Sequence, residues 1–390
     1  MENYRTTRNF IYDLAATVFF LSTYYILMPV LPIQMLAVGI NNLVIGTIMG
    51  LFSVTSMVAR PLGGIWVDTM GRRKLMFLSI ILFFTTPFFL NLPAVTIGFS
   101  LAQLIYGFSI GAFTVATTTF AADISSSGNV AQFMGYHSIA CIAAKGLAPA
   151  VGVRLMKTYG FSTTVSTTVI LALLASIFVF LLRDFKTGVE KNQSHSFIEV
   201  LLKKDVYLPT LVLFSGLVTF GAISAMLPVF AEERGLAGIE YFFVINTASV
   251  IFTRAVLGSW SKNYLENLVC ASLILLAISF IFMSFVVNFY QLIAVSVIYG
   301  LGYAMLFPVL SAILVLHISP EYKGMALGIF TAAFDLGVAA GTTMGGFSQY
   351  IDFKYLYLLL ALLPAAGFFL FKYTYLPLIH RTEKYGESES

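Results

Sequence analysis

The chain has 390 residues, of which 59% are hydrophobic and only 10% are charged, and its formal net charge is +4. A soluble domain carries about 25% charged residues, so this composition excludes a large water-soluble protein. The two cysteines, Cys141 and Cys270, both lie in apolar segments, which supports neither a disulfide framework nor a metal site.

Apolar segments follow one another along the whole chain, and a membrane helix needs about 20 apolar residues. The spans expected in the first half are residues 10–33, 43–66, 75–93, 96–121, 132–153 and 162–182. The spans expected in the second half are residues 208–231, 241–261, 267–287, 290–316, 325–347 and 354–373. We therefore predict an all-α membrane protein of twelve transmembrane helices, with an uncleaved first helix.

A polar stretch divides these spans into two sets of six. We predict an N-terminal six-helix bundle at 1–182, a cytoplasmic linker at 183–207, a C-terminal six-helix bundle at 208–373 and a cytoplasmic tail at 374–390. Lys and Arg are concentrated in the loops on one side of the predicted spans, and cytoplasmic loops carry an excess of these residues. Both termini are therefore expected in the cytoplasm.

The two halves also share short sequence patterns at similar spacing. The pairs include Tyr106-Gly107 with Tyr299-Gly300, and Arg60 with Arg254. Two pseudo-symmetric six-helix bundles in parallel repeat, with a substrate site at their interface, are typical of transporters.

The loop after the second predicted helix combines glycines, a carboxylate and basic residues at fixed spacing. These residues are Gly64, Asp68, Gly71, Arg72 and Arg73. Gly63 and Gly64 are expected to let their helix approach a neighbour closely, and Gly71 permits a tight turn. The spacing resembles the signature loop between the second and third helices of the major facilitator superfamily. The resemblance implies the twelve-helix fold of that superfamily, with this loop as a cytoplasmic gate.

The fifth predicted helix has a small-residue pattern, Gly135-x8-Ala144-x3-Ala148-Pro149-x2-Gly152. This pattern is similar to the antiporter motif of the superfamily's drug exporters. The resemblance implies proton-coupled export across a bacterial inner membrane. Those exporters carry a buried arginine in the fourth helix, whereas this chain has Gln103 there. The residue that the resemblance links to proton transfer is therefore replaced.

Ionisable residues inside membrane helices are costly, by about 2.5–3.5 kcal/mol at a helix centre, and usually functional. Lys145 lies near the middle of the fifth predicted helix. It is a candidate cation for a substrate carboxylate, with a structural ion pair as the alternative. Asp335 lies mid-span in the eleventh. It could bind a cationic group, carry a proton, pair with Lys145 or cap a broken helix.

Two further candidates for proton coupling lie about one turn inside the cytoplasmic edge. Asp13, in the first predicted helix, could carry a proton, or it could be hydrated at the headgroups or cap its helix. His137, in the fifth, has a structural role as its alternative. The tyrosines expected either to line a cavity or to pack are Tyr24, Tyr25, Tyr106, Tyr299 and Tyr303.

No nucleophile–base pair, phosphate-binding loop or metal-ligand spacing appears, so we predict no enzyme activity, cofactor, metal or nucleic-acid binding. We expect a monomeric secondary transporter that exports a small organic molecule in exchange for protons, with the lipid bilayer as its surroundings. The substrate is expected to be an amphiphilic drug or a carboxylate-bearing, siderophore-like metallophore. Uptake of a small organic anion and a transporter-like sensor or scaffold are the alternatives.

Overall fold

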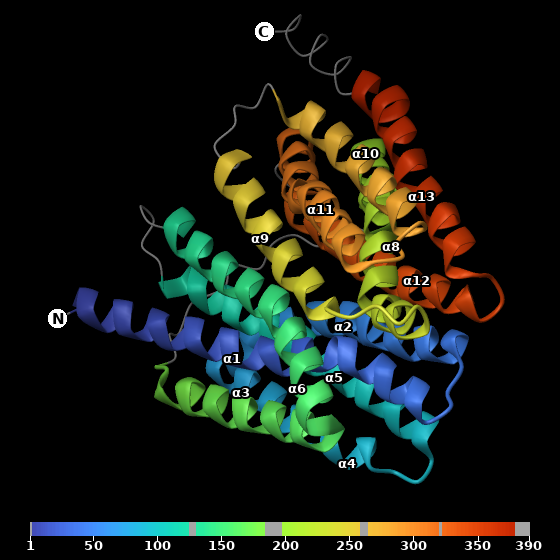
Figure 1. Ribbon diagram of the computed structural model, residues 1–390. Coiled ribbons are helices and arrows are strands. Elements are labelled where there is room, and N and C mark those ends of the chain that lie inside the picture. The colour runs from blue at the N-terminus through green and yellow to red at the C-terminus, as the bar shows by residue number, and fades with distance from the viewer. Residues whose placement is uncertain (1, 125–129, 184–196, 258–263, 320–321, 379–390) are drawn as a thin grey trace, which may run out of the picture. The chain divides into compact units, whose positions relative to one another are not determined.

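The computed structural model describes residues 2–124, 130–183, 197–257, 264–319 and 322–378, and the elements in these ranges are helical (Figure 1). Contacts within the chain divide it into two compact units. One comprises residues 1–191 with 227–232, and the other comprises residues 192–226 with 233–390.

The helices of the first unit are α1 (Glu2–Ala37), α2 (Asn42–Met70), α3 (Arg72–Phe83), α4 (Thr86–Leu90), α5 (Val95–Ile124) and α6 (Val130–Leu181). α1 packs along α6, and α2 packs along α5. The apolar part of α6 has 49 residues, more than twice the roughly 20 that one crossing needs. It is interrupted at Gly160, whose φ of 81° glycine adopts readily because it has no Cβ. The fifth and sixth predicted spans therefore follow each other without a loop.

The second unit repeats this series of helices. Its helices are α7 (Phe197–Leu201), α8 (Lys204–Glu233), α9 (Ile239–Leu257), α10 (Leu265–Met283), α11 (Phe289–His317), α12 (Lys323–Gly346) and α13 (Phe353–Leu370). A short 3-10 turn, Phe347–Gln349, follows α12, and a π-helical turn, Phe371–Tyr375, extends α13. Most of the predicted linker, and the tail beyond residue 378, lie outside the described residues.

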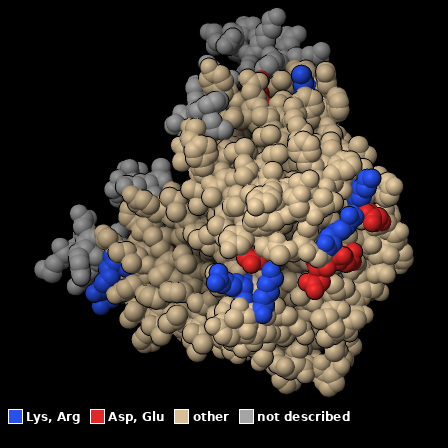
Figure 2. Space-filling view, viewed as in Figure 1, with Lys and Arg blue, Asp and Glu red and all other residues tan. Residues whose placement is uncertain are grey.

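Eleven helical stretches within the described ranges are long and apolar enough to cross a membrane. The longest of them, Phe133–Leu181, supplies two crossings, which gives six in each half. The prediction of an all-α membrane fold is therefore confirmed. On the face shown in Figure 2, residues other than Lys, Arg, Asp and Glu cover most of the surface. Large apolar side chains such as Phe180 and Ile81 are exposed, as expected of surface that faces lipid.

The internal repeat extends from sequence to individual helix contacts. A Cβ on Gly107 of α5 would collide with the carbonyl oxygen of Phe52 on α2. In the second unit, a Cβ on Gly300 of α11 would lie 2.8 Å from the carbonyl oxygen of Asn246 on α9. Small residues let membrane helices approach closely, so both units use glycine at the same helix crossing.

A second glycine contact is also repeated. Gly152 of α6 packs against the carbonyl oxygen of Ile26 on α1, and Gly341 of α12 packs against that of Val218 on α8. The fifth span of each half therefore lies directly against the backbone of the first. In the first unit this contact holds α6 against α1, and these two helices carry Lys145 and Asp13.

Candidate functional site

A buried polar cluster joins α1, α5 and α6. The Thr117 hydroxyl on α5 donates to Asp13 Oδ1 at 2.7 Å. Thr117 Oγ1 also lies 2.6 Å from Thr17 Oγ1 and 3.2 Å from His137 Nε2. Asp13, Thr17 and Thr117 are fully buried, and His137 is 4% exposed. Two of the residues expected in proton coupling, Asp13 and His137, therefore meet at one hydroxyl.

The other carboxylate oxygen of this cluster has a different environment. Asp13 Oδ2 is buried and has no hydrogen-bond partner among the described residues. The carboxyl group is thus neither hydrated at the membrane surface nor a cap of its helix, because α1 begins at Glu2, well before it. A buried carboxylate in which only one oxygen accepts a hydrogen bond is costly to keep charged. In this respect Asp13 differs from a carboxylate at the surface, which water can hydrate.

Lys145 lies eight residues after His137 on α6, with Cys141 midway, so the three share one face of the helix. Cys141 Sγ lies 3.8 Å from His137 Nδ1. Lys145 Nζ lies 5.8 Å from the centroid of the Tyr25 ring, a distance typical of a cation–π contact. The lysine side chain is exposed. Within the described part of the chain no carboxylate forms an ion pair with it, so its ammonium group is available to a ligand.

The aromatic residues of the first unit pack on one another. Tyr24 stacks on Phe52 at 3.8 Å between ring centroids, and its ring lies 5.6 Å from those of Tyr25 and Tyr106. Tyr24 and Tyr106 are 2% and 0% exposed, whereas Tyr25, at 9%, also contacts Lys145. Of these three tyrosines, the structure brings Tyr25 to the lysine and places the other two within the packed interior.

Gln103, which stands in place of the exporters' arginine, is also fully buried. Its Nε2 donates to the thioether sulfur of Met49 at 2.8 Å. Its Oε1 has no hydrogen-bond partner among the described residues. Gln103 cannot hold a charge, so any proton carried in this unit must reside elsewhere.

In the second unit, Asp335 on α12 is 3% exposed. Its chain neighbour Phe334 packs against Phe220 of α8 and Phe307 of α11. Thr331, one turn earlier, donates to the carbonyl oxygen of its own helix rather than to the carboxylate.

Two tyrosines of α11 lie among these aromatic rings. Tyr303 stacks on Phe220 at 5.0 Å and on Tyr299 at 6.0 Å between centroids. Tyr299 is 2% exposed and Tyr303 is partly exposed. Phe334, the residue before Asp335, is therefore part of an aromatic cluster in the second unit, and Tyr303 is the more exposed of the two tyrosines in that cluster.

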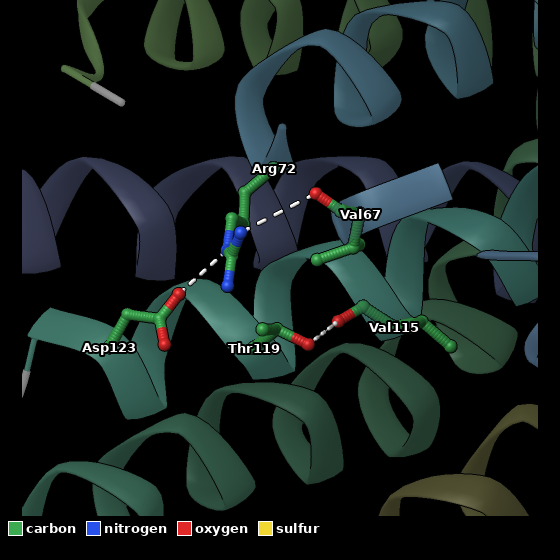
Figure 3. Close-up of polar contacts among 5 residues, drawn as sticks. All are labelled: Val67, Arg72, Val115, Thr119 and Asp123. Atoms are coloured by element: carbon green, nitrogen blue, oxygen red, sulfur yellow. Dashed lines mark hydrogen bonds and ion pairs between the residues drawn. The ribbon is translucent and has the colours of Figure 1, made fainter. Parts of the chain in front are cut away.

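The residues of the predicted gate form an ion pair that the sequence did not identify. Gly71, with φ 93°, ends α2 and precedes α3. Arg72 Nε donates to Asp123 Oδ2 at 2.6 Å, and Nη1 donates to the carbonyl oxygen of Val67 at 3.4 Å (Figure 3). The arginine thus joins the end of α2 and the start of α3 to the end of α5. Asp68 has no described side chain.

The next residue, Arg73, contacts α6. Its Nε and Nη2 donate to the carbonyl oxygens of Val179 and Phe180, at 3.2 and 2.6 Å. The last carbonyls of a helix lack intrahelical partners, so the guanidinium caps α6 where the first unit ends. The two arginines of the motif therefore fasten α3 to two different helices.

The close helix approach expected at Gly63 and Gly64 occurs at Gly63 alone. A Cβ on Gly63 would lie 3.3 Å from the Cα of Ala112 on α5, whereas a Cβ on Gly64 would meet no atom within 4 Å. The expectation for Gly64 was wrong because adjacent helical residues face different directions, and only Gly63 faces α5.

The Arg72–Asp123 pair should be energetically coupled because it is largely buried, with side chains 6% and 18% exposed. In a double-mutant cycle, Arg72→Gln and Asp123→Asn are expected to show a coupling of about 1–3 kcal/mol in the free energy of unfolding. The exposed pair Arg234–Asp352, at 34% and 56%, is the control and should give less than about 1 kcal/mol. Unfolding in detergent micelles measures both cycles, and equal coupling in the two pairs would contradict this prediction.

Two contributing residues, Thr117 and Asp123, were missed in the sequence, whereas helical spacing places Thr17 on the same stripe as Asp13. Thr117 resembles any threonine in an apolar span, and its pairing with Thr17 depends on the packing of α1 against α5. Asp123 could have been identified as a partner of Arg72, since it is ionisable and lies at the end of a span on the same side of the membrane as Arg72. The described residues contain no group of three or more His, Cys, Asp or Glu side chains that could hold a metal ion.

This chain is similar in sequence to bacterial proteins of known name. The chain is 24% identical over 370 residues to the staphylopine export protein of Staphylococcus aureus, covering 89% of this chain and 91% of that one. It is 24% identical over 343 residues to the quinolone resistance protein NorA of the same species, covering 82% and 84%. The first relative is named for the export of staphylopine and the second for resistance to quinolones.

The fold is also found among solved structures. The human organic anion transporter MFSD10 aligns with a TM-score of 0.69 at 19% identity, covering 94% of this chain and 99% of that chain. The family model described as Major Facilitator Superfamily matches residues 14–268 and 256–389. The chain therefore belongs to the major facilitator superfamily, a family of membrane transporters rather than enzymes.

Proposed function

We propose that this protein exports a small organic molecule with a negatively charged group across the bacterial inner membrane, in exchange for protons. The observation that carries this proposal is Lys145. It is an exposed ammonium group in the middle of an apolar span, held over the Tyr25 ring, with no carboxylate paired to it among the described residues. Uncompensated charge within a span is costly, and an anionic ligand would compensate it.

The ring beside Lys145 favours an amphiphilic or zwitterionic substrate. Tyr25 presents an aromatic face next to the cation, so a ligand could combine a carboxylate for Lys145 with an apolar or cationic part for the ring. The names of the two staphylococcal relatives support the export direction. A drug and a carboxylate-bearing metallophore both fit these requirements.

Asp13 is proposed to carry the proton, with His137 as its neighbour in the cluster. A carboxyl group that takes up a proton in a fully buried site avoids the cost of a buried charge, and Asp13 has one unsatisfied oxygen. Asp335 is the alternative carrier in the second unit. No nucleotide-binding motif occurs in the sequence, so an ion gradient is the energy source that this proposal requires.

The gate completes the proposed cycle. Gly64, Asp68, Gly71, Arg72 and Arg73 lie around the junction between α2 and α3, and the Arg72–Asp123 pair joins α2, α3 and α5 at one membrane face. Opening that face would require this pair to separate or move as a unit. We place the gate and both termini in the cytoplasm because Lys and Arg are concentrated in these loops, and we expect a monomer.

Proteoliposomes containing the purified protein test the proposal. Norfloxacin, a zwitterion with a carboxylate, and ethidium, a cation without one, serve as probes. With an acidic lumen, the protein fraction whose cytoplasmic face points outward should accumulate norfloxacin and release protons from the lumen, beyond the level in protein-free liposomes. Nigericin should abolish this accumulation. Protein-dependent accumulation only with an alkaline lumen would instead indicate uptake together with protons, and equal responses to both probes would contradict the role of the carboxylate.

A further inference from the structure

The Thr117 hydroxyl makes a different kind of hydrogen bond from the hydroxyls of the nearby threonines on α5. Thr119, also on α5, donates to the carbonyl oxygen of Val115 one turn earlier on its own helix (Figure 3). Thr114 likewise donates to the carbonyl oxygen of Ile110. That bond satisfies a hydroxyl locally and is common in membrane helices. Thr117 instead donates across to Asp13 of α1. Its hydroxyl is therefore held by contacts between helices.

The hydrogen-bonding capacity of this hydroxyl is fully used. A threonine hydroxyl has one donor hydrogen and two acceptor sites. Because the hydrogen goes to Asp13 Oδ1, the oxygen must accept from both of its other neighbours, Thr17 at 2.6 Å and His137 at 3.2 Å. This requires a hydrogen on His137 Nε2, since an imidazole nitrogen without one cannot donate. One atom on α5 thus joins the carboxyl group of α1 to the ring of α6.

We propose that Thr117 is the positioning residue of the proton site. Its hydroxyl holds the Asp13 carboxylate in a single orientation, supplies that group's hydrogen bond and connects it to the helix of Lys145. This inference rests on the proposed function, in which Asp13 exchanges protons. His137 and Lys145 are eight residues apart, about 12 Å along α6. The protonation state of Asp13 therefore acts on α6, the helix that presents the Lys145 ammonium group to the substrate.

Other groups near Asp13 must be distinguished from Thr117. The titratable and charged groups on the helices around it include Arg8 and Tyr12 of α1, Arg60 of α2, Asp123 of α5, and His137, Cys141 and Lys145 of α6. Asp123 is paired with Arg72. Among the described residues, the hydrogen bond that reaches the Asp13 carboxylate comes from Thr117, so substitution of Thr117 changes the carboxylate without altering any of these charges.

Infrared difference spectroscopy on the purified full-length protein tests this inference without any substrate. The carbonyl stretch of a protonated carboxyl group is followed as a function of pH, and the band absent in Asp13→Asn is assigned to Asp13. Thr117→Val, which is nearly isosteric but lacks the hydroxyl, should move the titration midpoint of this band upward by about 1–2 pH units. The charged form loses a hydrogen bond, so the protonated form persists to higher pH.

Matched variants define the outcomes. Thr117→Ser restores a hydroxyl and should return the midpoint close to wild type, while Thr119→Val removes a hydroxyl that serves its own helix and should leave it unchanged. Thr117→Ala provides a second hydroxyl-free variant should Thr117→Val not fold. A wild-type midpoint in both hydroxyl-free variants, or an equal shift in Thr119→Val, would overturn the role of Thr117 alone. If the wild-type protein shows no titrating band that Asp13→Asn removes, Asp13 is not the proton carrier, and both the proposed coupling and this inference fail.

Discussion

Asp13→Asn is expected to abolish gradient-driven accumulation of norfloxacin while leaving its exchange down a concentration gradient intact. The asparagine amide cannot bind or release a proton, so substrate movement is no longer coupled to the proton gradient. The amide keeps the shape of the side chain and an oxygen that accepts a hydrogen bond from Thr117. The measurement compares norfloxacin accumulation driven by a pH gradient with counterflow of labelled norfloxacin in the same proteoliposomes.

Two control variants separate this effect from general damage. Asp352→Asn removes a carboxylate that caps α13 and pairs with Arg234 at an exposed position, and it should accumulate norfloxacin normally. Asp335→Asn tests the carboxylate buried in the second unit. Accumulation at the wild-type level by Asp13→Asn would exclude Asp13 as the carrier, and loss of accumulation in Asp335→Asn alone would assign the proton to the second unit.

Lys145→Ala is expected to weaken norfloxacin binding by about 1.5–3 kcal/mol, or roughly 10- to 150-fold in Kd. This is the range for a hydrogen bond to a charged group. Ethidium binding should change far less, because ethidium has no carboxylate. Lys145→Arg keeps the charge but replaces a compact ammonium by a planar group, so it should restore affinity only in part. Equilibrium binding of both probes to the purified wild-type protein and to the two variants measures these affinities.

The melting temperature provides the second half of this test. No carboxylate is paired with Lys145 among the described residues, so Lys145→Ala should not leave a buried charge behind, and the protein should melt near the wild-type temperature. Lys354→Ala is the matched control, since Lys354 also lies over an aromatic ring, that of Phe285 at 5.4 Å, but at the start of α13. A stable Lys145→Ala protein with unchanged norfloxacin affinity would refute the binding role.

The fold was predictable because hydropathy alone locates membrane spans. Each of the twelve predicted segments corresponds to a helical stretch within the described residues. The boundary between the fifth and sixth was less accurate. The polar residues around Arg154 and Lys157 suggested a loop at 154–161, whereas α6 continues through them to Gly160. Charged side chains at a membrane face do not end a helix, and the positive φ of one glycine was enough to join two spans.

The site was predictable by residue type but not by partner. Burial of ionisable groups in apolar spans identified Asp13, His137, Lys145 and Asp335 from sequence. The structure brings the first two together through Thr117. That contact joins residues more than 100 positions apart, so no local pattern could have predicted it. The pairing of Arg72 with Asp123, 51 residues away, depended in the same way on how α3 packs against α5.

The repeated glycine contacts set the register between the halves, and this register gives Asp13 a counterpart. Ile26 and Val218, which face Gly152 and Gly341, are 192 residues apart, and the same interval leads from Asp13 to Asp205. Asp205 lies in the first turn of α8, where free backbone N–H groups stabilise a carboxylate. In the first unit the helix begins at Glu2 instead, several turns earlier, so the equivalent carboxylate lies inside a continuous helix. The same position of the repeat is therefore a helix start in one half and an enclosed acid in the other, so the two halves are chemically unequal.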